Sequence, residues 1–393
     1  MANFQKLDNL LKQFIEEGLP GCAMKIVQHG ETIFEGYYGY ADIESGRKVT
    51  KDSLFRQASL SKIPLYTTAM ILYEKGKFNL TDPIGEYLPE WKESKKFDRH
   101  PNGEMYIVPT ERPISVSDVL SMKCGLPYCH GDFYTEDPTM KSMQECMRPL
   151  WEKGHFTVQE HIAAMSKAVL AYEPGTHWIY GFSSEITAAL IEAVYGKDID
   201  TAFKELLFDP LEMNNTRSRF FGDAQERMVT LYGWDKDGKL VPTPSPMDDK
   251  HLPGEEHEAG WARLFSNVDD YGKLFGMLAN GGVYKGERII GRKTIDLMRF
   301  NGLHGQQIED LQSDGWPYNA GYGYGYGFRT LIDKAAANHN GDLGSFGWTG
   351  GFGTWGEADP AEGVGIVYMH NTTPNHELKY HHRMRNVAYG CLD

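Results

Sequence analysis

The sequence has no long apolar run and no apolar leader. A membrane-spanning helix needs roughly 18 to 20 consecutive apolar residues, and no stretch of the chain approaches that length. The first residues, MANFQKLDNLLKQFIEEGLPG, mix acids and lysines with apolar side chains, which is typical of an amphipathic helix and not of a secretory signal. The five cysteines form an odd set with no paired framework. We therefore expect a reduced, cytoplasmic protein that makes no membrane contact.

The sequence also lacks an excess of positive charge. Its formal net charge is −14 at pH 7, so contact with the phosphates of a nucleic acid would be repulsive. It contains neither the Gly-x-Ser-x-Gly motif of α/β-hydrolases nor the His-Glu-x-x-His motif of zinc hydrolases. These absences favour a small-molecule partner, and we expect neither a metal nor a cofactor. They leave the oligomeric state open.

Hydrophobic patterns and turn residues predict the main elements. Residues 22–40 form two β-rich runs around a His-Gly turn, which is a hairpin signal. Residues 59–76 predict a helix that ends at a glycine, and residues 266–282 predict a helix with an Asn or Ser cap and a Gly-Gly stop. Residues 80–115 and 220–260 are polar and are expected to be irregular.

The order of these elements suggests how the chain is divided. Residues 115–126 and 183–211 have amphipathic helical patterns, and the second is expected to end at Gly196 before a new helix begins. The last third of the chain is β-rich. Strands at both ends with helices between them predict one sheet built from both termini. We therefore expect an α/β sheet domain from residues 1–75 and 262–393, with a helical and irregular domain, residues 76–261, inserted into it.

One short stretch places a serine and a lysine in position for nucleophilic chemistry. Ser59 and Lys62 are three residues apart, so they share a face of a helix. A serine hydroxyl is a weak nucleophile until a base accepts its proton, and a lysine can be that base when burial lowers its pKa. A second Ser-x-x-Lys, Ser45 to Lys48, lies in a polar turn and is expected to be solvated. We expect Ser61 to face elsewhere on the turn.

Two further segments could complete such a site. Tyr180 follows a Pro-Gly turn and precedes a helix start, so its phenol could exchange protons with Ser59 or a leaving group. The segment GSFGWTGGFGTWGEADP is rich in glycine, which lets a backbone amide such as that of Gly351 approach an oxyanion. Taken alone, each segment is also compatible with a structural role.

Together these motifs resemble the serine β-lactamase and penicillin-binding-protein-like superfamily. The superfamily carries Ser-x-x-Lys with Ser-Asp-Asn and Lys-Thr-Gly partners. The resemblance extends over roughly residues 8–370, and it is strongest to the class C β-lactamase branch, in particular to family VIII carboxylesterases. The three elements here read Ser59-Leu60-Ser61-Lys62, Tyr180-Gly181-Phe182 and Trp348-Thr349-Gly350.

The resemblance implies a fold and a set of roles. The fold would be the β-lactamase/transpeptidase-like one, an antiparallel sheet flanked by helices, with the active site in the cleft between the two domains. Ser59 would be the acylated nucleophile, Lys62 its proton partner and Tyr180 a general base or acid. The backbone amides of Ser59 and Gly351 would form the oxyanion hole.

Two departures from the superfamily pattern narrow the expected substrate. Trp348 replaces the lysine of Lys-Thr-Gly, which would face the carboxylate of a β-lactam, and Phe182 replaces an asparagine. Both changes remove polar recognition and add aromatic surface. We therefore expect a carboxylesterase that cleaves esters of small neutral or partly apolar acyl groups. The expected substrate-binding residues are Trp348, Thr349, Gly350, Phe182 and Tyr128.

Other functions on the same fold remain open. A β-lactamase or a D-amino-acid amidase or peptidase would use the same nucleophile. An acyltransferase would pass the Ser59 acyl group to an alcohol instead of water. The alternative without catalysis is an inactive relative that serves as a binding or scaffold protein.

Overall fold

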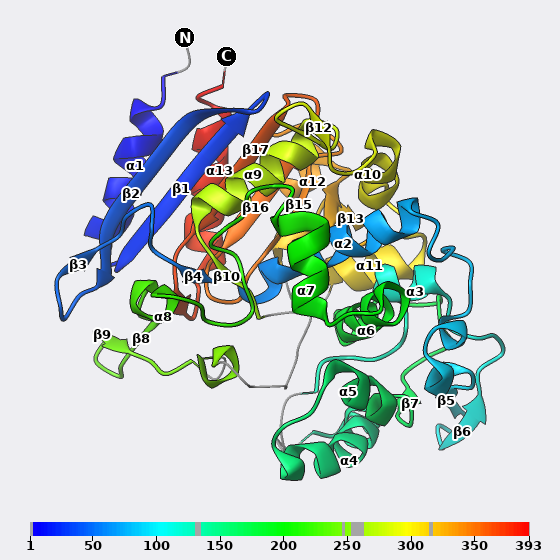
Figure 1. Ribbon diagram of the computed structural model, residues 1–393. Helices are drawn as coiled ribbons and strands as arrows, with labels where there is room; N and C mark the ends of the chain where they lie inside the picture. The colour runs from blue at the N-terminus through cyan, green and yellow to red at the C-terminus, as the bar shows by residue number, and fades with distance from the viewer. Residues whose placement is uncertain (1–2, 130–134, 246–247, 253–262, 314–316, 393) are drawn as a thin grey trace.

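The main sheet joins the two ends of the chain. The computed structural model describes residues 3–129, 135–245, 248–252, 263–313 and 317–392. Strand β1 lies beside β17, which is antiparallel to it, so N-terminal and C-terminal strands form one continuous sheet (Figure 1). In spatial order the eight strands are β13 (Tyr322–Tyr324), β14 (Arg329–Leu331), β15 (Phe346–Thr349), β16 (Trp355–Asp359), β17 (Val364–Met369), β1 (Gly21–Gln28), β2 (Glu31–Asp42) and β3 (Arg47–Lys48).

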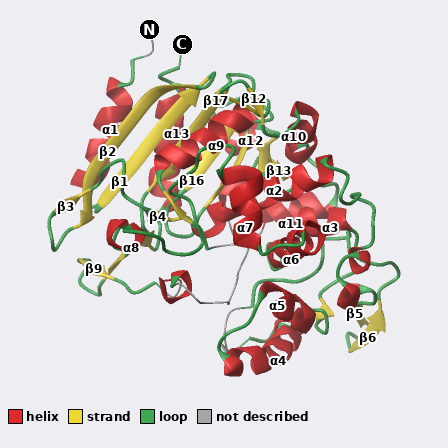
Figure 2. Ribbon diagram, viewed as in Figure 1, coloured by secondary structure: helices red, strands yellow, loops and turns green. Residues whose placement is uncertain are grey.

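Helices cover both faces of this sheet (Figure 2). On one face α1 (Gln5–Glu16) and α13 (Glu377–Tyr389) pack against alternate residues of β1 and β17, such as Ile26 and Tyr368. On the other face α9 (Val268–Ala279) packs against the residues between them. Because β1 and β17 are covered on both sides, nearly all of their residues are buried.

The remaining elements surround the sheet and its helices. The other helices are α2 (Lys62–Glu74), α3 (Val116–Leu120), α4 (Pro138–Lys153), α5 (Val158–Met165), α6 (Ser183–Tyr195), α7 (Ile199–Phe203), α8 (Ala224–Arg227), α10 (Arg292–Arg299), α11 (Gln306–Ser313) and α12 (Lys334–Ala337). The short strands are β4 (Phe55–Arg56), β5 (Lys95–Arg99), β6 (Met105–Pro109), β7 (Val169–Leu170), β8 (Tyr232–Trp234), β9 (Leu240–Pro242), β10 (Phe265–Ser266), β11 (Val283–Tyr284), β12 (Glu287–Arg288) and β18 (Thr372–Thr373).

Several sequence-based expectations are confirmed. The sheet is built from both termini, and the β1–β2 hairpin falls within residues 21–42. The side chain of Asn267 caps α9 by accepting from the amide of Asp270, and the Gly-Gly pair that follows has positive φ at both residues. Helix α6 ends at Gly196 in the left-handed conformation, as its pattern predicts. The division into two domains stays a prediction.

Three expectations about local structure are wrong. Residues 80–115 are not wholly irregular, because β5 and β6 form an antiparallel hairpin there. Residues 220–260 include α8, β8 and β9. The helix expected over residues 115–126 stops at Leu120, since Met122 and Gly125 both adopt positive φ, which an α-helix cannot contain.

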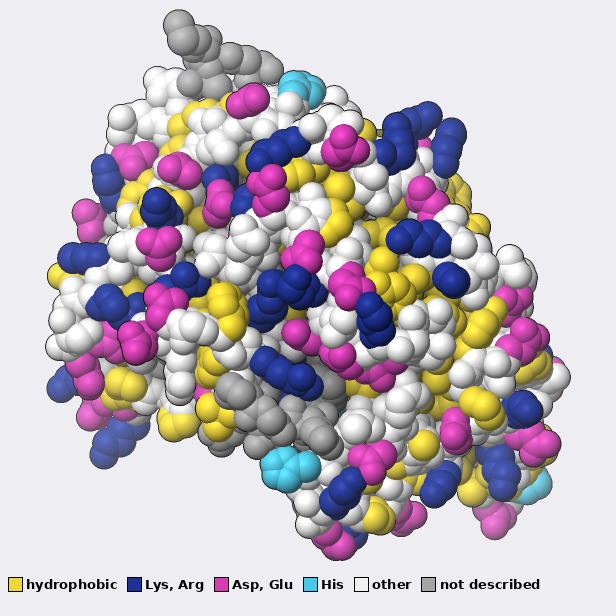
Figure 3. Space-filling model, in the orientation of Figure 1, with side chains coloured by type: hydrophobic (Ala, Val, Ile, Leu, Met, Phe, Trp, Pro, Cys, Tyr) yellow, Lys and Arg dark blue, Asp and Glu magenta, His cyan; other side chains and the backbone are white. Residues whose placement is uncertain are grey.

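The described residues contain no helix that is both long enough and apolar enough to cross a membrane. On the face shown in Figure 3, basic and acidic side chains are interspersed over the surface.

Candidate active site

Ser59 lies in a tight turn that joins β4 to α2. The 3-10 turn Ala58–Ser61 leads directly into the helix, whose first turn accommodates Pro64 because first-turn amides lack intrahelical partners. Ala58 has φ of 46°, an unfavourable conformation for a residue with a Cβ, and such conformations often occur at functional sites. Ser59 is half-buried, whereas the residues on either side of it are buried.

Lys62 is held in an apolar environment beside that serine. Its side chain is fully buried, and its Nζ lies 3.4 Å from Ser59 Oγ. The amine also faces aromatic rings, 4.8 Å from the ring centroid of Tyr180 and 5.5 Å from that of Tyr128. Burial lowers the pKa of Lys62 to about 7, and the negative charge of Glu185 opposes that shift. A large fraction of Lys62 can therefore be a neutral proton acceptor near pH 7.

The backbone before α6 brings Tyr180 to the same place. Gly181 forms an isolated antiparallel bridge with Pro127, and a Cβ at Gly181 would lie 1.8 Å from the carbonyl oxygen of Leu126. This close approach puts the rings of Tyr128 and Tyr180 5.1 Å apart in an edge-to-face arrangement. Burial raises the pKa of Tyr180, and hydrogen bonding to Ser59, Trp348 and Tyr128 opposes the rise. The phenol is thus a protonated donor at neutral pH.

Strand β15 supplies the third side of the site. The indole Nε1 of Trp348 donates to the phenol oxygen of Tyr180 at 3.1 Å, and Trp348 is only 1% exposed. Thr349 turns to the opposite face of the sheet, where its hydroxyl donates to Glu377 at 2.9 Å. This alternation follows from the pleat of the strand. Trp348 is therefore part of the Ser59 cluster, whereas the Thr349 side chain is not.

The glycines after β15 approach the turn that carries Ser59. A Cβ at Gly350 would lie 2.3 Å from the carbonyl oxygen of Gln57, so the two segments are in close contact there. Gly351 is exposed, and no atom lies within 4 Å of the position its Cβ would take. The backbone of Gly351 is therefore open on its Cβ side.

The sequence also indicated positions for two aromatic residues, Phe182 and Tyr128, and for Ser61. Phe182 packs edge-to-face on Tyr128, with ring centroids 5.4 Å apart, and the Tyr128 ring in turn faces the Lys62 amine. Ser61 points away from the cluster, since its Oγ accepts from the amide of Leu264 at 3.1 Å. The structure thus brings together Ser59, Lys62, Tyr180, Trp348 and Tyr128, with Phe182 at the edge.

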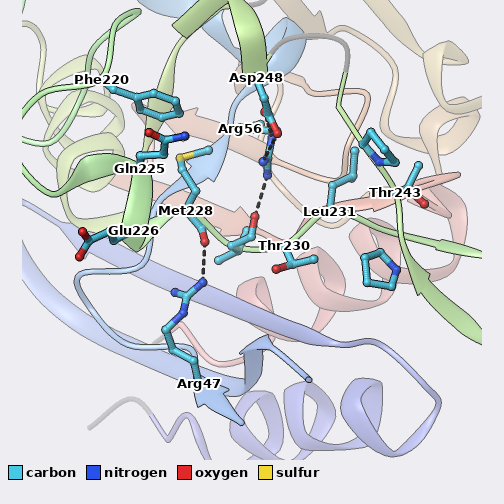
Figure 4. A pocket seen from close by; sticks show the side chains of 13 residues that line it. Arg47, Arg56, Phe220, Gln225, Glu226, Met228, Thr230, Leu231, Thr243 and Asp248 are labelled. Carbon is cyan, nitrogen blue, oxygen red and sulfur yellow. Dashed lines mark hydrogen bonds and ion pairs between the residues drawn. The ribbon is translucent and has the colours of Figure 1, made fainter. Parts of the chain in front are cut away.

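A separate cavity of about 510 Å³ adjoins the strand that leads to Ser59 (Figure 4). One of its charged lining residues is Arg56, which is buried and pairs with both carboxylate oxygens of Asp248, at 2.6 and 2.8 Å. The same guanidinium donates to the carbonyl of Val229 at 2.7 Å. These contacts anchor β4 to Val229 and Asp248, and they hold the strand that precedes the turn with Ser59.

Comparison with known proteins identifies the family. The beta-lactamase family profile matches residues 7–389, nearly the whole chain. The chain belongs to the beta-lactamase family. This membership confirms the expected superfamily and its fold, and the protein is a serine hydrolase of the β-lactamase and penicillin-binding-protein superfamily.

Relatives within the superfamily differ in their named activities. Esterase EstB of Burkholderia gladioli is 25% identical, over 93% of this chain and 90% of its own. An N-acetylmuramyl-L-alanine amidase of Bacillus subtilis is also 25% identical, over 93% of this chain and 80% of its own. The solved structure of EstCE1, a hydrolase with promiscuous acyltransferase activity, superimposes with a TM-score of 0.80 at 23% identity and 98% coverage of both chains. The beta-lactamase family alone therefore leaves the reaction open.

Sequence interpretation missed one buried acid beside this site. Glu185 is in the first turn of α6, five residues after Tyr180, and it is 1% exposed. The sign of it in the sequence is the first acidic residue of SSEITAALIEAV, near the start of an otherwise apolar helix. In an isolated sequence that position is equally typical of a favourable helix-dipole interaction at a solvated surface.

Proposed function

We propose that this member of the beta-lactamase family is a serine carboxylesterase that acts through an acyl-enzyme on Ser59. The observation that carries the proposal is the buried Lys62 amine, 3.4 Å from Ser59 Oγ, with a pKa of about 7. In this reaction Ser59 attacks the ester carbonyl, Lys62 accepts its proton, and Tyr180 protonates the leaving alcohol. Water then hydrolyses the acyl-enzyme by the reverse proton movements.

The oxyanion would be stabilised by two backbone amides, those of Ser59 and Gly351. Each such donor contributes about 10²- to 10³-fold in rate. The open space beside Gly351 and the close contact between Gly350 and Gln57 support this assignment, because they leave room for a carbonyl oxygen next to the Ser59 turn.

The choice of a neutral substrate rests on Trp348. An indole N–H, not an ammonium, faces Tyr180 where the superfamily has the lysine of Lys-Thr-Gly. Phe182 and Tyr128 add aromatic surface next to it. These groups support an ester with a small neutral or partly apolar acyl group, since they offer no charge to a substrate carboxylate. EstB, one of the relatives, is named an esterase.

The decisive experiment measures hydrolysis of p-nitrophenyl esters of rising acyl length beside hydrolysis of nitrocefin. We expect the short esters to be the better substrates, and we expect Ser59→Ala to lose at least about a thousandfold in kcat/KM. Ser61→Ala, a matched control two residues away, should keep the parent activity. Parent-level ester hydrolysis by Ser59→Ala would refute the proposal, and faster turnover of nitrocefin would favour a β-lactamase.

Acyl transfer is the second candidate, because EstCE1, which shares the fold, is described as having that activity. Adding a primary alcohol to the ester assay separates the two outcomes. An increase in the new ester at the expense of free acid would show transfer, whereas unchanged acid release would show hydrolysis alone. A fluorophosphonate that fails to label Ser59 would instead indicate an inactive relative.

A further inference from the structure

Glu185 is a buried carboxylate for which the proposed reaction has no role yet. Its side chain is 1% exposed, in a helix whose neighbouring residues are apolar or small. The hydroxyl of Ser184 donates to its Oε2 at 3.0 Å. Burying a carboxylate is unfavourable unless nearby groups compensate for its lost hydration.

The surroundings of Glu185 are the residues of the candidate site. Helix α6 packs against α2, which carries Lys62 and Tyr66, and the segment after α3 adds Tyr128. Tyr180 precedes α6 directly. The Glu185 charge raises the pKa of the base Lys62 and also those of the three phenols. Among the described residues, these four groups surround the site and are each electrostatically coupled to Glu185.

The sign of each coupling suits the proposed proton transfers. Burial lowers the pKa of Lys62, and an amine with too low a pKa would not accept the Ser59 proton. The carboxylate opposes this by favouring the ammonium, which is the form Lys62 takes once Ser59 has been deprotonated. For Tyr180 the same charge disfavours phenolate, so the phenol keeps the proton that the leaving group requires.

On the basis of the proposed esterase function, we propose that Glu185 is a positioning residue of the Ser59 site, whose buried negative charge holds the transferred proton on Lys62. In acylation, Ser59 Oγ forms the new bond to the carbonyl carbon while its proton moves to Lys62 Nζ. The ester C–O bond then breaks, and the leaving oxygen takes the proton of Tyr180. The Lys62 ammonium returns a proton to Tyr180, so the site ends the step in its starting protonation state.

The first test compares pH profiles of kcat/KM for a non-ionising ester. Glu185→Gln removes the charge but keeps the shape, and its acidic limb should move to lower pH by about one unit. Glu185→Asp, which keeps the charge, should restore the limb toward the parent position. Glu192→Gln is the matched control: it lies two turns along the same helix and contacts Gln159 and Ile199 instead. A Glu185→Gln profile that overlays the parent would overturn the proposal.

The second test does not depend on catalysis. Urea midpoints are measured for the parent, Glu185→Gln, Lys62→Met and the double variant, at about pH 5.5, where Lys62 is charged, and at about pH 9, where it is neutral. Glu185→Gln should lower the midpoint more when Lys62 is present than when it is Met, and this difference should vanish at the higher pH. An equal loss in both backgrounds, including complete unfolding of both, would show a merely structural role.

These outcomes separate the two proposals. If Ser59→Ala is inactive but the midpoints show no coupling, only the role of Glu185 fails. If Ser59→Ala retains ester hydrolysis, the proposed function fails, whatever the midpoints show.

Discussion

Lys25 and Lys62 are both buried lysines, but their neighbours differ in kind. Lys25 lies in β1, where its Nζ is 2.6 Å from a carboxylate oxygen of Asp269 and 3.5 Å from one of Glu35. Lys62 lies at the start of α2, where its Nζ is 3.4 Å from a serine hydroxyl and faces the rings of Tyr128 and Tyr180.

The contrast shows how the surroundings determine the chemistry of one side chain. Carboxylates at ion-pair distance compensate Lys25 for its lost hydration, and the Lys25–Asp269 pair ties β1 to α9. At Lys62 burial dominates and brings the pKa to about 7. We infer that the first lysine serves structure and the second is suited to exchange a proton.

Replacing each lysine by methionine should give the largest effect. Lys62→Met removes the proton acceptor, so kcat/KM for a short p-nitrophenyl ester should fall at least about a thousandfold. Lys25→Met removes an ammonium that contacts no residue of the Ser59 cluster, and activity should stay within about threefold of the parent. Steady-state kinetics with active-site titration by a fluorophosphonate checks both.

The comparison would break if the two variants lost activity to the same extent while both remained folded. Circular dichroism and thermal melting of each variant distinguish that outcome from unfolding. Equal losses would mean that the Lys62 variant loses activity for the same structural reason as the Lys25 variant, and not because a proton acceptor is missing.

The sequence allowed a prediction for Lys62 but not for Lys25, and the reason is physical. Ser59 and Lys62 are three residues apart on one helical face, so their contact is local and follows from spacing. Lys25 and Asp269 are 244 residues apart, and their contact depends on how α9 packs on the sheet. Likewise, nothing local indicates that Glu185 is buried beside Lys62 or that Trp348 donates to Tyr180, 168 residues away.

The same distinction holds for the fold. The Asn267 cap of α9 and the left-handed Gly196 after α6 are local signals, and both were predicted. The β5–β6 hairpin was not, since its first strand, KKFDR, is highly charged and partly exposed. Charged residues have low strand propensity, and pairing with β6 and β7 provides the order that the sequence alone does not indicate.

Removing the Lys25 partner should affect stability but not activity. Burial alone would raise the pKa of Asp269, but hydrogen bonds and charges from Lys25 and Lys273 bring it below the ordinary value. A carboxyl with a lowered folded-state pKa stabilises the fold above about pH 4, and that contribution is lost as the pH falls through the folded-state value. Asp269→Asn removes the pairs with Lys25 and Lys273, and because 39% of the Asp269 side chain is exposed, solvent screening should limit the loss in the free energy of unfolding to about 1.5 kcal/mol at neutral pH.

Urea unfolding at neutral pH and below about pH 4 checks the sign, because the gap between the parent and Asp269→Asn should narrow on acidification. Asp296→Asn is the control, since it disrupts surface pairs with Arg292 and Arg299 and should cost less than about 1 kcal/mol. If the difference in the free energy of unfolding between the parent and Asp269→Asn widened in acid, that result would contradict the assignment of Lys25 and Asp269 as an ion pair.

The smallest expected effect is that of Trp348→Phe. It tests whether burial, or the hydrogen bond from Trp348 to Tyr180, determines the pKa of Lys62. Trp348→Phe keeps most of the aromatic bulk but removes the N–H that donates to Tyr180 at 3.1 Å. Losing one such hydrogen bond should reduce kcat about tenfold, because the phenol is less well oriented toward the leaving group. The acidic limb of the pH profile should remain near pH 7, since the burial that lowers the Lys62 pKa is unchanged.

Trp355→Phe, at an equally buried tryptophan on β16, should leave kcat at the parent value. A limb that moved with Trp348→Phe would mean that the indole, and not burial, determines when Lys62 can accept a proton.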